Sequence, residues 1–482
     1  MSTVLAPRPT AAEISALTPP SRNRYADLLR LSSLLVVVVG HWLMAGVTYD
    51  GDGLHGINIL VARPWTQWLT WVFQVMPVFF FVGGYANATG WASARGRGVG
   101  YVEWVRGRAA RLLRPTLPVV ALWVPLAGAL ALAGVADDIL RMGTATVMIP
   151  MWFLSVYIVV VALTPVTYRL HERFGVRAFA GLALIAAAVD AAHVAGTPFI
   201  GWTNFVWVWA AVHQLGYLWR DGTMTSRRHT PVALALGGLG LLVALTTVAG
   251  YPVSMLGVDD AVRSNNSPPS VALVVLGVMQ MGVLLGVRHR VEQWLQHPRR
   301  WAAVVAGGSV AMTLYLWHMT ALVAGIGFAY LLRLLPASAF DTTWWVTRPL
   351  WLAVLAALLA PLVLLFRRFE RPGSVTPLGT HAHTVALTLV GAAATCAGLG
   401  LLIGRGLHIP GAPLGLPIVA LGALISGLAA LGVVDRTTAR TVRSAVLTAR
   451  AGRGPWTQAT GTNATTKASP GPTSPTGSSP RP

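Results

Sequence analysis

The chain has 482 residues, of which 54% are hydrophobic and only 11% are charged, against roughly 25% charged residues in a soluble domain. Because single hydrophobic cores stop growing near roughly 250–300 residues, this composition excludes a water-soluble globular protein. A net charge of +20 suggests nucleic acid only in a soluble protein; in a membrane protein, basic residues orient the chain. We therefore expect an all-α polytopic protein in a lipid bilayer, with no nucleic-acid partner.

Twelve apolar runs are long enough to cross the roughly 30 Å of hydrocarbon in a bilayer. The residues before the first run are polar and lack a cleavage site, so we expect a retained helix rather than a removed signal peptide. The long run 302–332 is interpreted as one helix with an irregular end. The runs lie near 31–49, 67–90, 115–135, 148–167, 178–195, 199–219, 231–250, 270–287, 302–332, 345–366, 384–404 and 415–434.

The distribution of basic residues supports twelve spans. With the N-terminus in the cytosol, the segments on the cytosolic side hold 30 of the 36 Lys and Arg residues. Since Lys and Arg concentrate in cytosolic loops, a wrong helix count would scramble this alternation. We expect a multi-pass protein of the plasma or inner membrane with both termini in the cytosol.

His41 is the strongest candidate for chemistry among the ionisable residues of the apolar runs, because such groups are costly in lipid and are functional hypotheses by default. Eleven residues separate it from Arg30, so the two share a helix face with a rise of roughly 16 Å between them. Asp27 lies three residues before Arg30 on that face. His41 is either a general base near the bilayer midplane or a buried histidine satisfied by a backbone carbonyl. The other candidates are Asp190, His193, His213 and His318.

Arg108, Arg111 and Arg114 are spaced three apart and are expected to form one stripe at the cytosolic membrane face. Pro115 follows them, and proline is tolerated where a helix starts. The stripe is either ordinary positive-inside charge or a clamp for phosphates, which the bidentate geometry of arginine favours. In the second apolar run, Gly83 and Gly84 would let a backbone or a ligand approach closely.

These segments together resemble the acyltransferase-3 family of membrane acyltransferases. Arg30 and His41 match its first-helix signature, a basic residue and a histidine separated by ten residues. The segment Phe79-Phe80-Phe81-Val82-Gly83-Gly84-Tyr85 looks like its second-helix motif. Two overlapping copies of its Arg-x-x-Arg motif end at Arg111 and at Arg114, and either pair could be the equivalent one. Other similar motifs are Trp152-Phe153-Leu154, Leu215-Gly216-Tyr217 and Tyr315-Leu316-Trp317-His318.

The resemblance implies a bacterial enzyme that transfers an acyl group, usually acetyl, from acyl-CoA to a hydroxyl of a carbohydrate, a glycolipid or a secondary metabolite. His41 would be its general base or would itself take the acyl group, and no metal is expected. Arg30, Arg108, Arg111 and Arg114 would hold the phosphates of coenzyme A. The residues expected to line the site are Asp27, Gly83, Gly84, Tyr85, Trp152, Tyr315 and His318.

The resemblance and the composition together divide the chain. A cytosolic segment 1–23 precedes a ten-helix membrane domain 24–372, two additional helices 373–437 and a disordered cytosolic tail 438–482. The choice of acceptor is expected to depend on outer loops such as 50–66, 136–147 and 251–269. The alternatives are a transporter or flippase without covalent chemistry, although the related halves usual in transporters are not evident, and a structural membrane protein.

Overall fold

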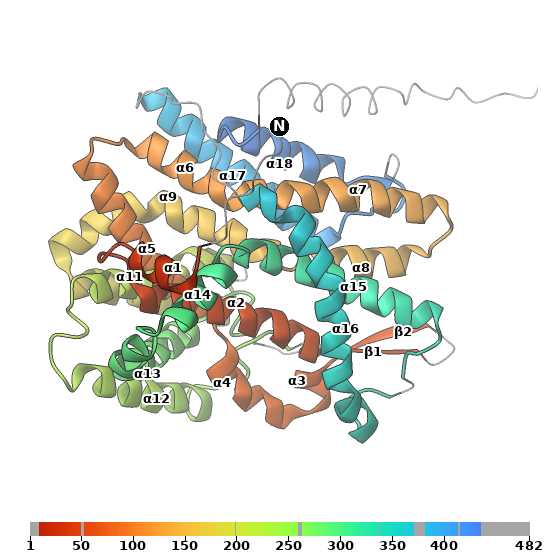
Figure 1. The fold of residues 1–482 in the computed structure, drawn as a ribbon, viewed down its shortest axis with the longest axis horizontal. Coiled ribbons are helices and arrows are strands. Elements are labelled where there is room, and N and C mark those ends of the chain that lie inside the picture. Colours follow the sequence, from red (N-terminus) through yellow and green to blue (C-terminus); the bar gives the residue numbers. More distant parts are fainter. Residues whose placement is uncertain are drawn as a thin grey trace, which may run out of the picture.

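The computed structural model describes residues 9–49, 53–197, 199–258, 263–336, 338–370, 381–412 and 415–434. These residues are mainly helical, with one antiparallel hairpin of two strands (Figure 1). The α-helices are α1 (Ala11–Ala16), α2 (Arg24–Met44), α3 (Ile59–Ala62), α4 (Thr70–Phe73), α5 (Met76–Gly96), α6 (Tyr101–Leu113), α7 (Leu117–Leu132), α8 (Asp137–Met148), α9 (Met151–Phe174), α10 (Val176–Val194), α11 (Asn204–Arg220), α12 (Thr230–Thr247), α13 (Val271–Trp294), α14 (Pro298–Gly308), α15 (Ala311–Leu331), α16 (Thr342–Phe366), α17 (Ala382–Arg405) and α18 (Ile418–Ala430). The strands are β1 (Ala45–Tyr49) and β2 (Leu54–Asn58), and the 3-10 helices are η1 (Pro64–Leu69), η2 (Arg114–Thr116), η3 (Ile200–Thr203) and η4 (Arg367–Glu370).

The expected all-α polytopic fold is confirmed. In the described part of the chain, 10 helical segments are long and apolar enough to cross a membrane. Two further expected spans correspond to α11 and α18, which have 17 and 13 residues and are not among these ten. The count of twelve is compatible with this arrangement but is not established by it.

The run 302–332 is not one helix, as the sequence suggested, but is divided between α14 and α15. α14 ends at Gly307 and Gly308, residues of low helix propensity. Ser309 then closes the helix end, since its hydroxyl donates to the carbonyl of Ala306 at 2.7 Å. A run of apolar residues indicates a segment that is stable in lipid, but it does not indicate where one helix ends and the next begins.

Two stretches differ from the expectation, one expected to be a loop and one expected to be helix. The expected outer loop 136–147 is almost entirely helix α8, whose first turn carries Asp137 and Asp138, since carboxylates are favourable at a helix N-terminus. The end of the first apolar run forms β1, which pairs with β2. The hairpin continues beyond α2 toward the far ends of α15 and α16 (Figure 1), where the ring of Tyr49 lies 5.5 Å from that of Tyr330.

Helix α5 lies inside the bundle, in contact with α2, α9, α11 and α13. Helices α5 and α11 pack closely because a glycine of each helix lies against the backbone of the other. A Cβ added at Gly84 would collide with the carbonyl oxygen of His213, and one added at Gly216 would collide with that of Phe81. Gly84 therefore allows close helix packing, as small residues do between membrane helices. Gly83 instead faces the ring of Tyr157, which would lie 2.8 Å from an added Cβ.

The two C-terminal helices belong to the same packed bundle. α17 and α18 pack against each other, and α17 also contacts α6, α8 and α9. Arg106, only 3% exposed, donates from Nε to the carbonyl of Leu431 just past α18, at 3.0 Å. At the other end of the pair, Nε2 of His408 lies 2.8 Å from Oδ1 of Asp137. The tail expected to be disordered lies outside the described residues.

Replacing Arg106 with alanine is expected to lower the free energy of unfolding by about 2–3 kcal/mol, because the change removes a buried charged donor from the Leu431 carbonyl. The matched control is Arg111→Ala on the same helix, whose exposed side chain should change stability by less than about 0.5 kcal/mol. Thermal unfolding of both variants in detergent, followed by circular dichroism, measures the difference. Equal stability of the two variants would contradict a structural role for Arg106.

Candidate active site

The imidazoles of His41 and His318 lie side by side where α2 meets α15. Nδ1 of His41 is 2.8 Å from Nε2 of His318. The ring planes differ by 4° while the ring centroids are 5.1 Å apart. Rings stacked face to face would lie closer, near the roughly 3.5–4 Å of carbon contacts, so the two imidazoles meet edge to edge. His318 is fully buried, whereas His41 keeps part of its surface accessible.

His318 is held by backbone on one side and by α2 on the other. Its Nδ1 lies 2.6 Å from the carbonyl oxygen of Tyr315, one turn earlier in α15. Its own carbonyl accepts a hydrogen bond of 3.0 Å from the indole of Trp42, the residue after His41. The two helices are therefore fastened together directly at the imidazole pair.

The pair lies well inside the length of the bundle, although His41 is only three residues from the end of α2. α2 and α15 lie side by side in the bundle. α15 continues for thirteen residues beyond His318, which corresponds to about 20 Å of helix, and the hairpin extends α2 in the same region. Arg30 lies toward the other end, with Nη2 3.8 Å from the position of a Cβ at Gly308.

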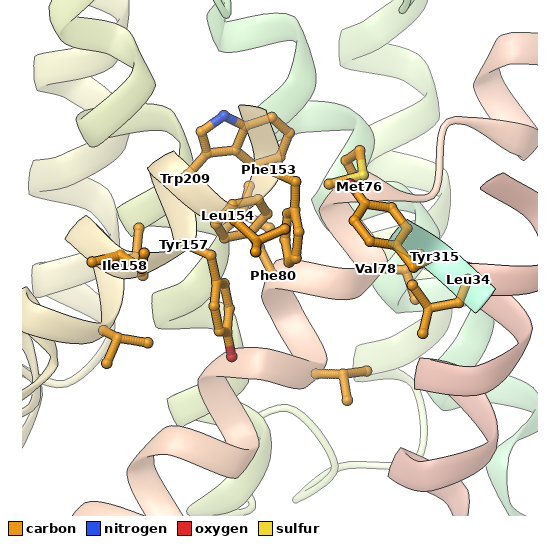
Figure 2. Close-up of a cluster of buried hydrophobic side chains, with 14 of the residues drawn as sticks. Leu34, Met76, Val78, Phe80, Phe153, Leu154, Tyr157, Ile158, Trp209 and Tyr315 are labelled. Carbon is orange, nitrogen blue, oxygen red and sulfur yellow. The ribbon is translucent and has the colours of Figure 1, made fainter. Parts of the chain in front are cut away.

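A row of aromatic rings, here called the aromatic wall, begins beside the imidazole pair. Its members are Tyr315, Phe153, Tyr157 and Phe79. Tyr315 donates from its hydroxyl to the carbonyl of Pro150 at 2.8 Å, and its ring meets that of Phe153 edge-on at 5.8 Å. The ring centroid of Phe153 in turn lies 5.2 Å from that of Tyr157 and 4.6 Å from that of Phe79. Figure 2 shows Tyr315, Phe153 and Tyr157 lying along one region of the buried core, with Phe80 between them.

Arg108 lies at the other end of this wall. Its guanidinium packs against α5, where a Cβ at Gly90 would collide with it, and Nη2 donates to the carbonyl of Ala86 at 3.4 Å. It also lies 5.4 Å from the ring centroid of Trp104. Arg108 interacts electrostatically with Tyr157 and with two further arginines, Arg30 and Arg111.

The expected arginine stripe is therefore not uniform. Arg108 turns toward the neighbouring helix, Arg111 is exposed, and Arg114 is partly buried in η2, where α6 has already ended. Arg30 is paired with Asp27 at 3.1 Å, and Asp27 also accepts from Arg22 at 2.7 Å. The positive charges of Arg30 and Arg111 therefore both act on Arg108.

The sequence singled out His213 as a candidate but did not predict its two polar partners beside Arg108, Asn87 and Tyr157. Nδ2 of Asn87 donates to the hydroxyl of Tyr157 at 3.2 Å and lies 3.0 Å from Nε2 of His213. Oδ1 of Asn87 is buried and has no hydrogen-bond partner among the described residues. The only sequence signal was the position of Asn87 one turn after Gly84, which places both residues on the α11 side of α5.

Three other expected residues lie away from the imidazole pair. Trp152 is half-buried, and its ring centroid lies 6.5 Å from that of Phe205 and 6.1 Å from that of Trp209. Asp190 accepts hydrogen bonds from Asn204, Tyr251 and the backbone of Val271, which joins α10 to Tyr251 and to the start of α13. His193 packs instead against Gly201.

Tyr85 lies at the end of the bundle that carries Arg24. Its ring contacts Trp219 at 4.4 Å, and it lines a cavity of about 450 Å³. The other lining residues are Thr18, Pro19, Pro20, Ser21, Arg22, Asn23, Arg24, Arg288, Glu292 and Gln296.

Comparison with known proteins gives one result. A family model described as an acyltransferase domain matches residues 23–368, from the start of α2 to η4. Searches of the curated proteins and of the solved structures gave no match. The match includes both imidazoles and all four arginines singled out above, and it ends before α17.

Proposed function

Because the chain belongs to the acyltransferase-3 family, we propose that it transfers an acyl group, expected to be acetyl, from acyl-CoA to a hydroxyl. The acceptor proposed is a carbohydrate, a glycolipid or a related molecule. The protein is a multi-pass membrane protein, and we place it in the plasma or inner membrane with both termini in the cytosol. That orientation rests on the positive-inside distribution of its basic residues.

The observation that carries the proposal is the position of His41 inside the bundle, only partly buried as a residue and paired with His318. Its Nδ1 is engaged by His318, so Nε2 is the nitrogen left for a substrate. An imidazole titrates near neutrality and is the commonest general base in enzymes. A histidine that only filled space would be expected to bury both nitrogens, as His318 does.

The convergence of arginines supports a polyanionic donor. Arg30 and Arg111 both act on Arg108 with like charge, and Asp27 is already shared between Arg22 and Arg30. Such a cluster is stabilised by an anion, and guanidinium groups hold phosphates through charge-assisted hydrogen bonds. The phosphates of coenzyme A would bind there, and its pantetheine arm would follow the aromatic wall toward His41.

In the proposed reaction, Nε2 of His41 takes the proton of the acceptor hydroxyl while that oxygen attacks the carbonyl carbon of the thioester. The tetrahedral intermediate then loses the sulfur as its C–S bond breaks. The products are the ester and a coenzyme A thiolate, which takes up the proton from His41. Atoms and charge balance without a metal or a redox cofactor.

The proposal is tested with purified protein in lipid nanodiscs, acetyl-CoA and extracts of glycolipid or polysaccharide from the source cells. We expect release of free thiol that depends on the extract and on the protein. Mass spectrometry of glycans and lipids from cells with and without the protein then identifies the acceptor by its added acyl group. Failure to consume any acyl-CoA with any extract would contradict the proposal and favour a transporter.

A further inference from the structure

The backbone determines which nitrogen of each imidazole in the pair carries a hydrogen. Nδ1 of His318 faces the carbonyl oxygen of Tyr315 at 2.6 Å. A carbonyl oxygen can only accept, so Nδ1 of His318 must be protonated. In a neutral imidazole the other nitrogen is then an acceptor, and Nε2 of His318 accepts a hydrogen from Nδ1 of His41 at 2.8 Å.

The same chain of hydrogen bonds leaves Nε2 of His41 without a hydrogen. A general base needs a free lone pair at the nitrogen that faces the substrate. The near-coplanar rings keep the shared hydrogen in the plane of both imidazoles, where the lone pair of His318 lies. His41 is therefore held in the tautomer that can accept a proton at its unengaged nitrogen.

His318 is itself rigidly placed, which this role requires. It is fully buried, its carbonyl is fixed by Trp42, and the preceding turn is fixed by the bond from Tyr315 to Pro150. Among the described residues, the hydrogen-bond partners of the two rings are each other and the carbonyl of Tyr315, and neither ring bonds to a carboxylate. A neutral imidazole orients the base without the cost of a buried negative charge in a membrane bundle.

We propose that His318 is a positioning residue for the acyl transfer, which holds His41 in its Nδ1–H tautomer and accepts a hydrogen bond from the imidazolium formed when His41 takes the proton. The role resembles that of the aspartate that orients histidine in hydrolase triads, where loss of the correct tautomer lowers kcat about 10⁴-fold. The catalytic part of this inference rests on the proposed function. The tautomer does not.

The tautomer is measured first, on the whole protein in lipid with ¹⁵N-labelled histidine rings. Signals of His41 are assigned as those that disappear in His41→Gln. We expect a protonated Nδ1 and an unprotonated Nε2 on His41 in the unsubstituted protein, and loss of this pattern in His318→Leu. A protonated Nε2 on His41 in the unsubstituted protein would overturn the inference, whatever the enzyme's activity.

Kinetics test the consequence. His318→Leu should lower kcat by about 10²–10⁴-fold, the usual contribution of general base catalysis, with the KM for acetyl-CoA unchanged. His318→Gln should recover much of the loss, because its amide oxygen can accept from Nδ1 of His41. Thr320→Val changes another buried residue of α15, one that bonds to Trp123 instead, and should keep the original kcat.

The outcomes separate the two proposals. Full turnover by His318→Leu would overturn the positioning role and leave the acyl transfer standing. The same holds if both His318 variants lose activity in proportion to the folded protein recovered, since that is the mark of a purely structural residue. An unsubstituted protein that consumes no acyl-CoA contradicts the proposed function, and the nitrogen spectra still decide the tautomer.

Discussion

Replacing His41 with alanine should reduce acyl transfer by at least about 10²-fold, and up to about 10⁴-fold, the range that a positioned general base contributes. The protein should still reach the membrane, because the contact between α2 and α15 retains the bond from Trp42 to the His318 carbonyl. Thiol release from acetyl-CoA, normalised to purified folded protein, measures the effect.

Two variants control for this result. His41→Gln keeps a polar side chain that can hydrogen-bond to His318 but cannot accept a proton near neutral pH, so it should be as inactive as alanine. His193→Ala removes another histidine from an apolar helix, one that packs against Gly201, and should leave turnover intact. Transfer that survives in His41→Gln would require a different catalytic residue.

Replacing Arg108 with alanine should weaken binding of acetyl-CoA by about ten- to a hundredfold. Hydrogen bonds to charged groups contribute about 1.5–3 kcal/mol, and each 1.4 kcal/mol is tenfold in affinity. Arg108 is chosen because it packs inward against α5 and interacts with both Arg30 and Arg111. Calorimetric titration of coenzyme A into the detergent-solubilised protein measures the dissociation constant, which should also rise with salt.

The matched control removes one positive charge elsewhere. Arg97→Ala alters an exposed arginine just past α5, which is bonded to Ser93, and should not change affinity. Arg111→Ala should also weaken binding, and Arg114→Ala shows which Arg-x-x-Arg pair is used. If Arg114→Ala weakens binding while Arg108→Ala does not, the inward arginine is not part of the donor site.

Hydropathy predicted helices well where one apolar run makes one straight span, as in α12 and α13. It failed where the local backbone departs from that rule. The residues Gly46 to Tyr49 continue an apolar run but form a strand, because they pair with residues 54–57 in the next segment of the chain. In α8, a helix with two aspartates at its start looked like a polar loop.

The candidate site was predictable only in its local parts. The eleven-residue spacing put Arg30 and His41 on one side of α2, a property of helix geometry alone. The contact between His41 and His318 joins residues 277 positions apart, so it follows from how α15 packs and not from any local pattern. For the same reason the spacing of the arginines could not show that Arg108 turns inward while Arg111 is exposed.

The seam between the C-terminal helices and the rest of the bundle bears on how this protein can be shortened. A chain that stops where the family match stops would lose the Leu431 carbonyl opposite Arg106, His408 opposite Asp137, and the Leu407 amide that donates to Thr144. Lipid tails offer none of these hydrogen bonds. The smallest piece suited to purification therefore extends past Leu431, even though the catalytic candidates all precede residue 320.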